Sequence, residues 1–204
     1  EFIEPKIIEG EPIKENDAVI FFDFREDSAK QLIRVFAEEN FDKFARKKID
    51  NLFPVTMTRY EKSLPLNVLF EPLEITNPLA RVISEAGKKQ LHLAETEKYA
   101  HITYFFNGDI EESFSDEDRI LIPTKKDHDF AEDPAMSASE VTEKLLEAID
   151  SKKYDFIVVN YANADMVGHT GNFQATVSAV ETLDKEVGEI MPEILKNNGV
   201  LIIT

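Results

Sequence analysis

The stretch YDFIVVNYANADMVGHTG, residues 154–171, decides the fold that the sequence predicts. Its first half is a short apolar run typical of a buried strand. Its second half is small and polar, and an amphipathic helix with apolar residues from Phe173 to Ile190 follows it. We interpret GVLIIT (199–204) as a further strand. The resulting β-α-β unit predicts an α/β fold with a mostly parallel sheet and helices on both faces.

The rest of the chain alternates strands and helices in the same way. Apolar runs at DAVIFFDF (17–24), QLHLAE (90–95) and DRILIP (118–123) predict strands. In MSASEV (136–141), Ser137 and Glu140 have the spacing of a capping box, which predicts that a helix begins there.

Composition limits the partners that the chain can have. The 204 residues include 40 acidic and 23 basic ones, for a net charge of -17. Such a surface repels nucleic acid and anionic membranes, so neither is expected as a partner. A small anionic substrate requires cations placed locally. Because the chain has no cysteine, any transition-metal ligands must be His, Asp or Glu.

The sequence shows no membrane span of about 20 apolar residues and no signal-peptide pattern, which makes the cytoplasm the default location. Prolines punctuate an irregular stretch over 50–76, and we place a domain boundary near 73–76. The chain opens without methionine and stops directly after an apolar run. From these features we expect an internal fragment of a longer protein.

Asp165 and His169 stand four residues apart in the polar turn after the strand over 154–161. Ligands of open α/β sheets collect at the carboxyl ends of strands, and carboxylate with imidazole suits zinc or manganese. The two side chains can point the same way if the turn is helical. The alternative is that Asp165 caps the long helix and His169 is a surface residue. Spacing alone favours that alternative.

The longer string NYANADMVGHTG (160–171) changes this balance, because it closely resembles the metal-binding turn of the cofactor-independent phosphoglycerate mutases, members of the alkaline phosphatase superfamily. Other strings resemble the family in the family's order. They are AVIFFDFREDSAKQL (18–32), TRYEKSLPLNVLFEP (58–72), NPLARVISEAGKKQLHLAETEKYAHITYFFNG (77–108), EDRILIP (117–123) and AMSASEVTEKLLEAI (135–149). By this resemblance, which covers almost the whole chain, the chain is identified as a member of that family.

The resemblance implies an isomerase of glycolysis and gluconeogenesis that interconverts 3-phosphoglycerate and 2-phosphoglycerate through a phosphoserine. It implies two divalent ions, manganese first and magnesium or another ion as alternatives, and no organic cofactor. Residues 1–75 would be the C-terminal part of a transferase, substrate-binding domain, and residues 76–204 the truncated central part of an alkaline-phosphatase-like domain. The full-length protein would be a cytoplasmic monomer. The family's nucleophilic serine lies outside this chain, so the fragment alone would be inactive.

The same match assigns the site residues in the phosphatase part. Asp165 and His169 would be ligands of one manganese ion, and Lys98, in AETEKYAH, would contact the substrate phosphoryl group. Taken alone, Lys98 could be an ordinary charged residue at a helix start, although a cation is unfavourable to the helix dipole there. The other three histidines, which we interpret as structural or solvent-facing, are His92, His101 and His128.

In the transferase part, Arg25 and Asp27 match the first and third positions of the family's Arg-x-Asp-Arg substrate clamp, and Ser28 stands where the second arginine is expected. Guanidinium can bind carboxylate or phosphate through two parallel hydrogen bonds. The serine predicts weaker binding of substrate. Two alternatives to the mutase stay open: another alkaline phosphatase superfamily phosphomutase or hydrolase, and a non-catalytic interaction protein with the same fold.

Overall fold

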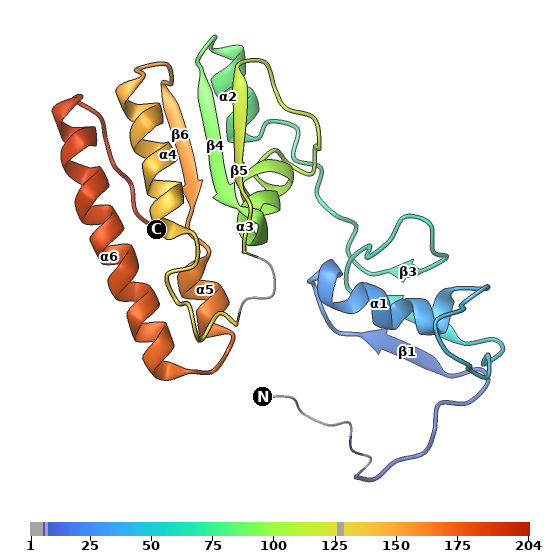
Figure 1. Cartoon of the computed structure of the whole chain (residues 1–204). Helices are drawn as coiled ribbons and strands as arrows, with labels where there is room; N and C mark the ends of the chain where they lie inside the picture. Colours follow the sequence, from blue (N-terminus) through green and yellow to red (C-terminus); the bar gives the residue numbers. More distant parts are fainter. Residues whose placement is uncertain (1–5, 7, 126–128) are drawn as a thin grey trace. The chain divides into compact units, whose positions relative to one another are not determined.

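The computed structural model describes residue 6, residues 8–125 and residues 129–204 (Figure 1). The chain divides into two compact units, one that ends at Glu74 and one that runs from Ile75 to Thr204. Each unit contains its own three-stranded sheet, and every strand pair in both sheets is parallel. The predicted α/β class with parallel sheets is confirmed.

The N-terminal unit is a small sheet with one helix packed on it. Its elements are β1 (Ala18–Phe21), α1 (Glu26–Ala37), β2 (Phe53–Thr56) and β3 (Asn67–Val68), and the strand order is β1-β2-β3. Because side chains alternate along a strand, Phe21 points toward α1, where it packs with Ile33 and Tyr60. The hydroxyl of Tyr60 donates to the carbonyl oxygen of Phe21 at 3.2 Å, which satisfies a buried polar group.

The opposite face of this sheet carries apolar side chains that stay exposed. Ile20 is 62% exposed, Phe22 84% and Phe53 53%. Phe53 lies opposite Ala18 in the register, so it shares a face with Ile20. An all-parallel sheet normally has both faces covered. Among the described residues of this unit, α1 covers one face, and on the other face Val55 is buried while Ile20 and Phe53 stay exposed.

The C-terminal unit holds the longer elements. They are α2 (Leu79–Glu85), β4 (Gln90–Glu95), α3 (Thr96–Ala100), the π-helical turn η1 (His101–Phe105), β5 (Glu117–Ile122), α4 (Ala138–Asp150), β6 (Phe156–Asn160), α5 (Asn163–Gly168) and α6 (Phe173–Lys196). The strand order is β5-β4-β6, so β4 is central and all six of its residues are buried. Figure 1 shows α4 and α6 on one side of this sheet.

Alternation along β4 divides the core of this unit between the two faces of its sheet. Leu91 and Leu93 pack against α4 and α6 in the main apolar cluster. On the other face, the Gln90 amide donates to the carbonyl oxygen of Ala80 in α2 at 2.8 Å. On the same face, His92 Nδ1 lies 2.6 Å from the carbonyl oxygen of Ile102 in η1. Helices therefore cover both faces, as the sequence predicts.

The predicted strand over GVLIIT (199–204) is wrong. These residues form no strand, and Val200, Ile202 and Ile203 are 84%, 81% and 67% exposed. An apolar run becomes a strand only where a neighbouring strand offers hydrogen bonds in register. Within the described residues β6 pairs only with β4, and residues 199–204 take no place beside it.

Helix α4 begins at Ala138, directly after Ser137, as the capping-box spacing predicts. The side chain of Ser137 nevertheless makes no capping hydrogen bond. Its backbone is not in the extended conformation that a capping residue usually has, with φ at -103° and ψ at 22°. Ser137 lies instead near enough to the carboxyl group of Glu95, at the end of β4, to lower the pKa of that carboxyl.

Candidate metal and phosphoryl site

The polar turn after β6 is helical, and this decides how Asp165 and His169 lie. Asp165 is in α5, and His169 is its C-terminal capping residue, four positions on. The spacing places both side chains on one side of the turn, with Asp165 Oδ1 3.5 Å from His169 Nε2. Both border an open depression together with Ala164 and Gly168. The carboxylate and the imidazole are 51% and 73% exposed, so both are accessible.

Asp165 does not cap the long helix. That position belongs to Asn172, whose side-chain oxygen accepts a hydrogen bond from the backbone N–H of Ala175 at 3.1 Å. The carboxylate of Asp165 is thus available for a cation. Spacing alone favours Asp165 as the cap of the long helix, and the structure shows Asn172 in that role instead.

Lys98 supplies such a cation from a distant part of the sequence. It lies in α3, directly after the central strand β4, and Figure 1 shows α3 and α5 at the same end of the sheet. Its ammonium group donates to Asp165 Oδ2, and its side chain is only 14% exposed. The hydrogen bond from Lys98 holds the pKa of Asp165 below its ordinary value, against an opposing effect of burial. The charges of Lys98, His169 and His101 act in the same direction as the hydrogen bond.

The donor atoms fit a divalent metal ion in kind. One carboxylate oxygen and one imidazole nitrogen suit manganese or zinc, and Gly168 adds no Cβ that would fill the depression. Two side chains are fewer than a metal ion requires. Among the described residues, no three histidine, aspartate or glutamate side chains come close enough together to hold one. Asp165 and His169 can therefore form part of a site whose remaining ligands come from elsewhere.

The other histidines differ in their surroundings. His92 is fully buried, and burial lowers its pKa. His101 is exposed, as expected for a solvent-facing residue, and it lies near enough to Asp165 to lower the pKa of that carboxyl. His128 lies outside the described residues.

The residues that match the substrate clamp lie in the N-terminal unit. Arg25 precedes α1 and Asp27 lies in its first turn. Arg25 Nε and Nη2 donate to the two carboxylate oxygens of Asp27 at 3.2 and 2.9 Å, which fixes the plane of an exposed guanidinium. The backbone of Ser28 belongs to α1, but its side chain lies outside the described part of the chain. Arg25 and Asp27 lie in the N-terminal unit, whereas Lys98 lies in the C-terminal unit.

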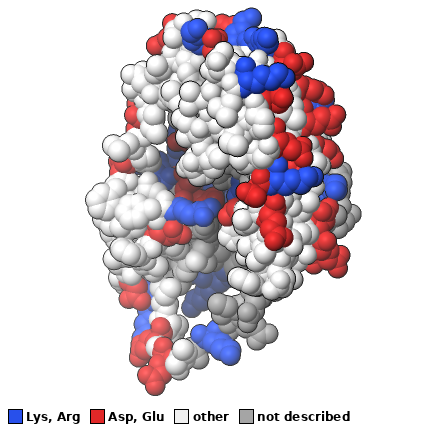
Figure 2. Space-filling model, turned by 90° about the vertical axis from the view of Figure 1, so that its left-hand side faces the viewer, with Lys and Arg blue, Asp and Glu red and all other residues white. Residues whose placement is uncertain are grey.

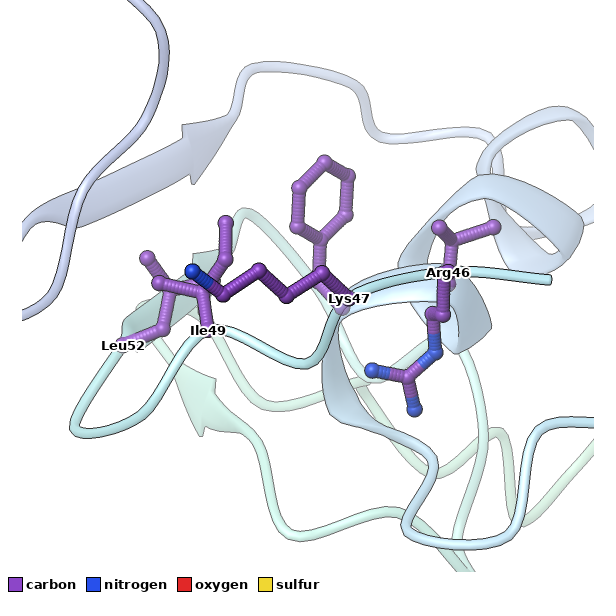
Figure 3. A pocket seen from close by; sticks show the side chains of 6 residues that line it. Arg46, Lys47, Ile49 and Leu52 are labelled. Atoms are coloured by element: carbon purple, nitrogen blue, oxygen red, sulfur yellow. The ribbon is translucent and has the colours of Figure 1, made fainter.

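A small pocket in the N-terminal unit is a poor alternative site. Figure 3 shows it lined by Arg46, Lys47, Ile49 and Leu52, with Val35 and Phe36 as the remaining lining residues. Its volume is about 60 Å³. Ligand pockets usually have at least about 300 Å³, so this one is too small to enclose an organic phosphate.

The charged surface gives a reason for placing cations at the site. On the face in Figure 2, acidic side chains gather along one side with basic ones among them. The net charge of -17 repels a phosphate ester at long range. Lys98 can offset this repulsion locally in the C-terminal unit, and Arg25 can do so in the N-terminal unit. No helix within the described ranges has the length and apolar character needed to cross a bilayer.

A fully buried carboxyl group close to this site was missed by sequence reasoning. Glu95 is the last residue of β4 and is 0% exposed. Thr124 Oγ1 donates to Glu95 Oε2 at 3.3 Å, and Ser137 lies near the carboxyl. These groups lower the pKa of Glu95, but burial is the larger effect and raises it above the ordinary value of 4.5. The only available signal was an acidic residue that closes a strand expected to be buried.

The raised pKa of Glu95 predicts how stability depends on pH. A carboxyl with a raised pKa in the folded state stabilises the fold below its unfolded pKa, and this stabilisation is lost as pH rises through the folded pKa. Glu95→Gln, which is neutral throughout, should therefore gain stability relative to the parent between pH 4 and pH 7. Urea unfolding at several pH values measures the difference. Glu181, an exposed residue of α6, provides the control Glu181→Gln, and a difference that does not change with pH would contradict the prediction.

The chain is thus an α/β protein with a carboxylate, an imidazole and an ammonium group at the carboxyl end of a parallel sheet, where ligands of such sheets usually bind. The particular family follows from comparison with known proteins. The chain belongs to the metalloenzyme superfamily, whose sequence model matches residues 22–204.

Its relatives include 2,3-bisphosphoglycerate-independent phosphoglycerate mutases. The one from Synechococcus sp. (strain JA-3-3Ab) is 49% identical over 203 residues, which are 100% of this chain and 38% of the relative. The one from Clostridium novyi (strain NT) is 50% identical over 210 residues, which are 100% of this chain and 41% of the relative. The chain thus spans about two fifths of the length of these relatives.

A solved structure resembles the chain as well. It is a crystal structure of Leishmania mexicana phosphoglycerate mutase at low cobalt concentration, with a TM-score of 0.66 and 32% sequence identity. The match covers 92% of this chain and 35% of that chain. The fold and the sequence therefore point to the same group of proteins.

Proposed function

We propose that the chain is part of a cofactor-independent phosphoglycerate mutase, which interconverts 3-phosphoglycerate and 2-phosphoglycerate through a phosphoserine. The observation that carries this proposal is the contact of Lys98 with Asp165 beside His169, because it gathers a metal-ligand pair and a phosphoryl-binding cation at one edge of the sheet. The names of the close relatives support the same activity.

In this proposal, Asp165 and His169 would hold one of two divalent ions, with manganese as the metal. When bound, such an ion polarises phosphoryl oxygens and favours ionisation of a hydroxyl nucleophile. Asp165 is anionic at neutral pH, as aspartates ordinarily are, and its lowered pKa favours the anion that a cation would bind. Lys98, held with little freedom at 14% exposure, would donate hydrogen bonds to the phosphoryl oxygens.

The N-terminal unit would bind the glycerate. Arg25 is pre-oriented by its two hydrogen bonds to Asp27, so it loses little side-chain freedom when it binds an anion. In the proposal, residues 1–75 belong to the transferase domain and residues 76–204 to the phosphatase domain. No residue of the chain is assigned as the serine nucleophile. The proposal further holds that the full-length protein is a monomer and is located in the cytoplasm.

The full-length protein that carries residues 1–204 tests this function. With 3-phosphoglycerate it should form 2-phosphoglycerate without added 2,3-bisphosphoglycerate. Removal of metal with EDTA should abolish the reaction, and manganese should restore it. Activity that survives EDTA treatment, or hydrolysis of the substrate to free phosphate without isomerisation, would contradict the proposal.

Ser28→Arg tests the clamp. If the guanidinium of residue 28 joins Arg25, a second charged donor should lower the KM for 3-phosphoglycerate by roughly tenfold, in line with the value of hydrogen bonds to charged groups. Steady-state kinetics of the full-length protein measures this, with Lys43→Arg, at an exposed position, as control. An unchanged or higher KM would show that this region binds substrate in another way.

A further inference from the structure

Glu95 has the surroundings of a residue that holds other groups in place. Its carboxyl group is fully buried at the carboxyl end of the central strand, on the same face as Leu91 and Leu93. Oε2 accepts a hydrogen bond from Thr124, whereas Oε1 makes none of normal geometry among the described residues. Burying a carboxyl group with incomplete hydrogen bonding costs free energy, so a merely structural position would favour an apolar residue.

Thr124 connects Glu95 to the start of the helix that carries Lys98. Its hydroxyl donates to Glu95, and its backbone N–H donates to Thr96 Oγ1 at 3.1 Å. Thr96 is the first residue of α3, and Lys98 follows two positions later. Thr124, in the segment after β5, is thereby hydrogen-bonded to Glu95, the last residue of β4, and to Thr96, the first residue of α3.

Ser137 connects the same carboxyl group to the support beneath α5. Its side chain makes no capping hydrogen bond to α4, and Ser137 lies near enough to Glu95 to lower the pKa of that carboxyl. Its neighbour Met136 packs with Val167 of α5 and Ala175 of α6 in a buried cluster. The groups around Glu95 are therefore linked to both helices of the ion pair, α3 with Lys98 and α5 with Asp165.

We propose that Glu95 is a positioning residue, which fixes the start of α3 through Thr124 and the base of α5 through Ser137, so that Lys98 meets Asp165. The inference rests on the proposed function only because that function assigns Lys98 and Asp165 to the metal and phosphoryl site. Glu95 touches neither substrate nor metal in this role. It acts through the groups that it holds.

Amine labelling of the chain tests this role directly. Each protein is treated with limiting acetic anhydride, and the acetylation of Lys98 is measured by peptide mass spectrometry relative to Lys185. Lys185 is a reference on α6 whose side chain is 72% exposed. Glu95→Ala should raise the Lys98 to Lys185 ratio about fivefold, because a buried hydrogen-bonded anchor is lost. Glu95→Gln, whose amide oxygen can still accept from Thr124, should stay close to the parent, as should the exposed control Glu97→Ala.

Thr124→Val keeps the proposal testable if Glu95→Ala does not fold. It replaces the hydroxyl with a methyl group of similar size, so the ratio should rise about twofold to threefold, and Thr124→Ser should restore it. An unchanged ratio in both Glu95→Ala and Thr124→Val, with only the melting temperature lowered, would overturn the proposal and leave Glu95 a structural residue. Labelling uses neither metal nor phosphoglycerate, so failure of the mutase assay would leave this result intact.

Discussion

Asp165→Ala and His169→Ala are each expected to abolish most of the activity of the full-length protein and to weaken manganese binding by at least about 100-fold. Changes in the groups that merely orient metal ligands already cost 10- to 100-fold in affinity, and loss of a ligand should cost no less. Asp165→Ala also removes the carboxylate that pairs with the ammonium group of Lys98, whose side chain is only 14% exposed. Calorimetric titration with manganese and the coupled mutase assay measure the two effects.

The control for these variants is Asp184→Ala, which removes an exposed carboxylate from α6 in the same unit. It should change neither metal affinity nor turnover. If both site variants kept a normal metal content and near-normal turnover, the assignment of Asp165 and His169 as ligands would be wrong. Loss of activity with metal binding retained would instead give these residues another role.

Lys98→Met should weaken phosphoglycerate binding by about 10- to 100-fold, the value of a charge-assisted hydrogen bond in a site of low exposure. Methionine keeps the length of the side chain and removes its charge. Lys98→Arg should recover part of the affinity, and Lys185→Met on α6 should have no effect. Equal affinity in Lys98→Met and the parent would remove Lys98 from the substrate site.

The same variant has a consequence for acid stability. Lys98 holds the pKa of Asp165 low, and a lowered pKa stabilises the folded state above the unfolded pKa. The parent loses this stabilisation as pH falls through the folded pKa of Asp165. Below about pH 4, the usual carboxylate range, Lys98→Met should therefore lose less stability than the parent. NMR titration of the Asp165 carboxyl should show its pKa closer to the ordinary value.

Local patterns predicted helices and strands whose spacing of apolar residues lies within the segment itself. QLHLAE forms β4 over Gln90–Glu95, and the periodic apolar residues after Asn172 form α6. GVLIIT (199–204) has an equally apolar pattern and forms no strand, because pairing depends on a neighbour that the segment does not contain. The capping-box spacing located the start of α4, but it did not show that Ser137 lies near Glu95.

In the candidate site, too, contacts between residues close in sequence were predictable, and contacts between distant residues were not. The four-residue spacing of Asp165 and His169, with a helical turn, was enough to place the two groups together. The contact of Lys98 with Asp165 spans 67 residues, so no local pattern contains it, and only the family resemblance marked Lys98. For Glu95 the sequence offered only an acidic residue at the end of a strand expected to be buried, because its hydrogen bond to Thr124 joins segments 29 residues apart.

The exposed apolar face of β1 and β2 has a practical consequence for work with this chain. Ile20, Phe22 and Phe53 present a hydrophobic surface to solvent, and such a surface favours contact between copies as concentration rises. Light scattering and sedimentation should therefore depend on concentration in a way that reflects this face rather than a functional assembly. The variant Phe22→Ser offers a simple means to distinguish self-association through this hydrophobic surface from ligand binding at the site.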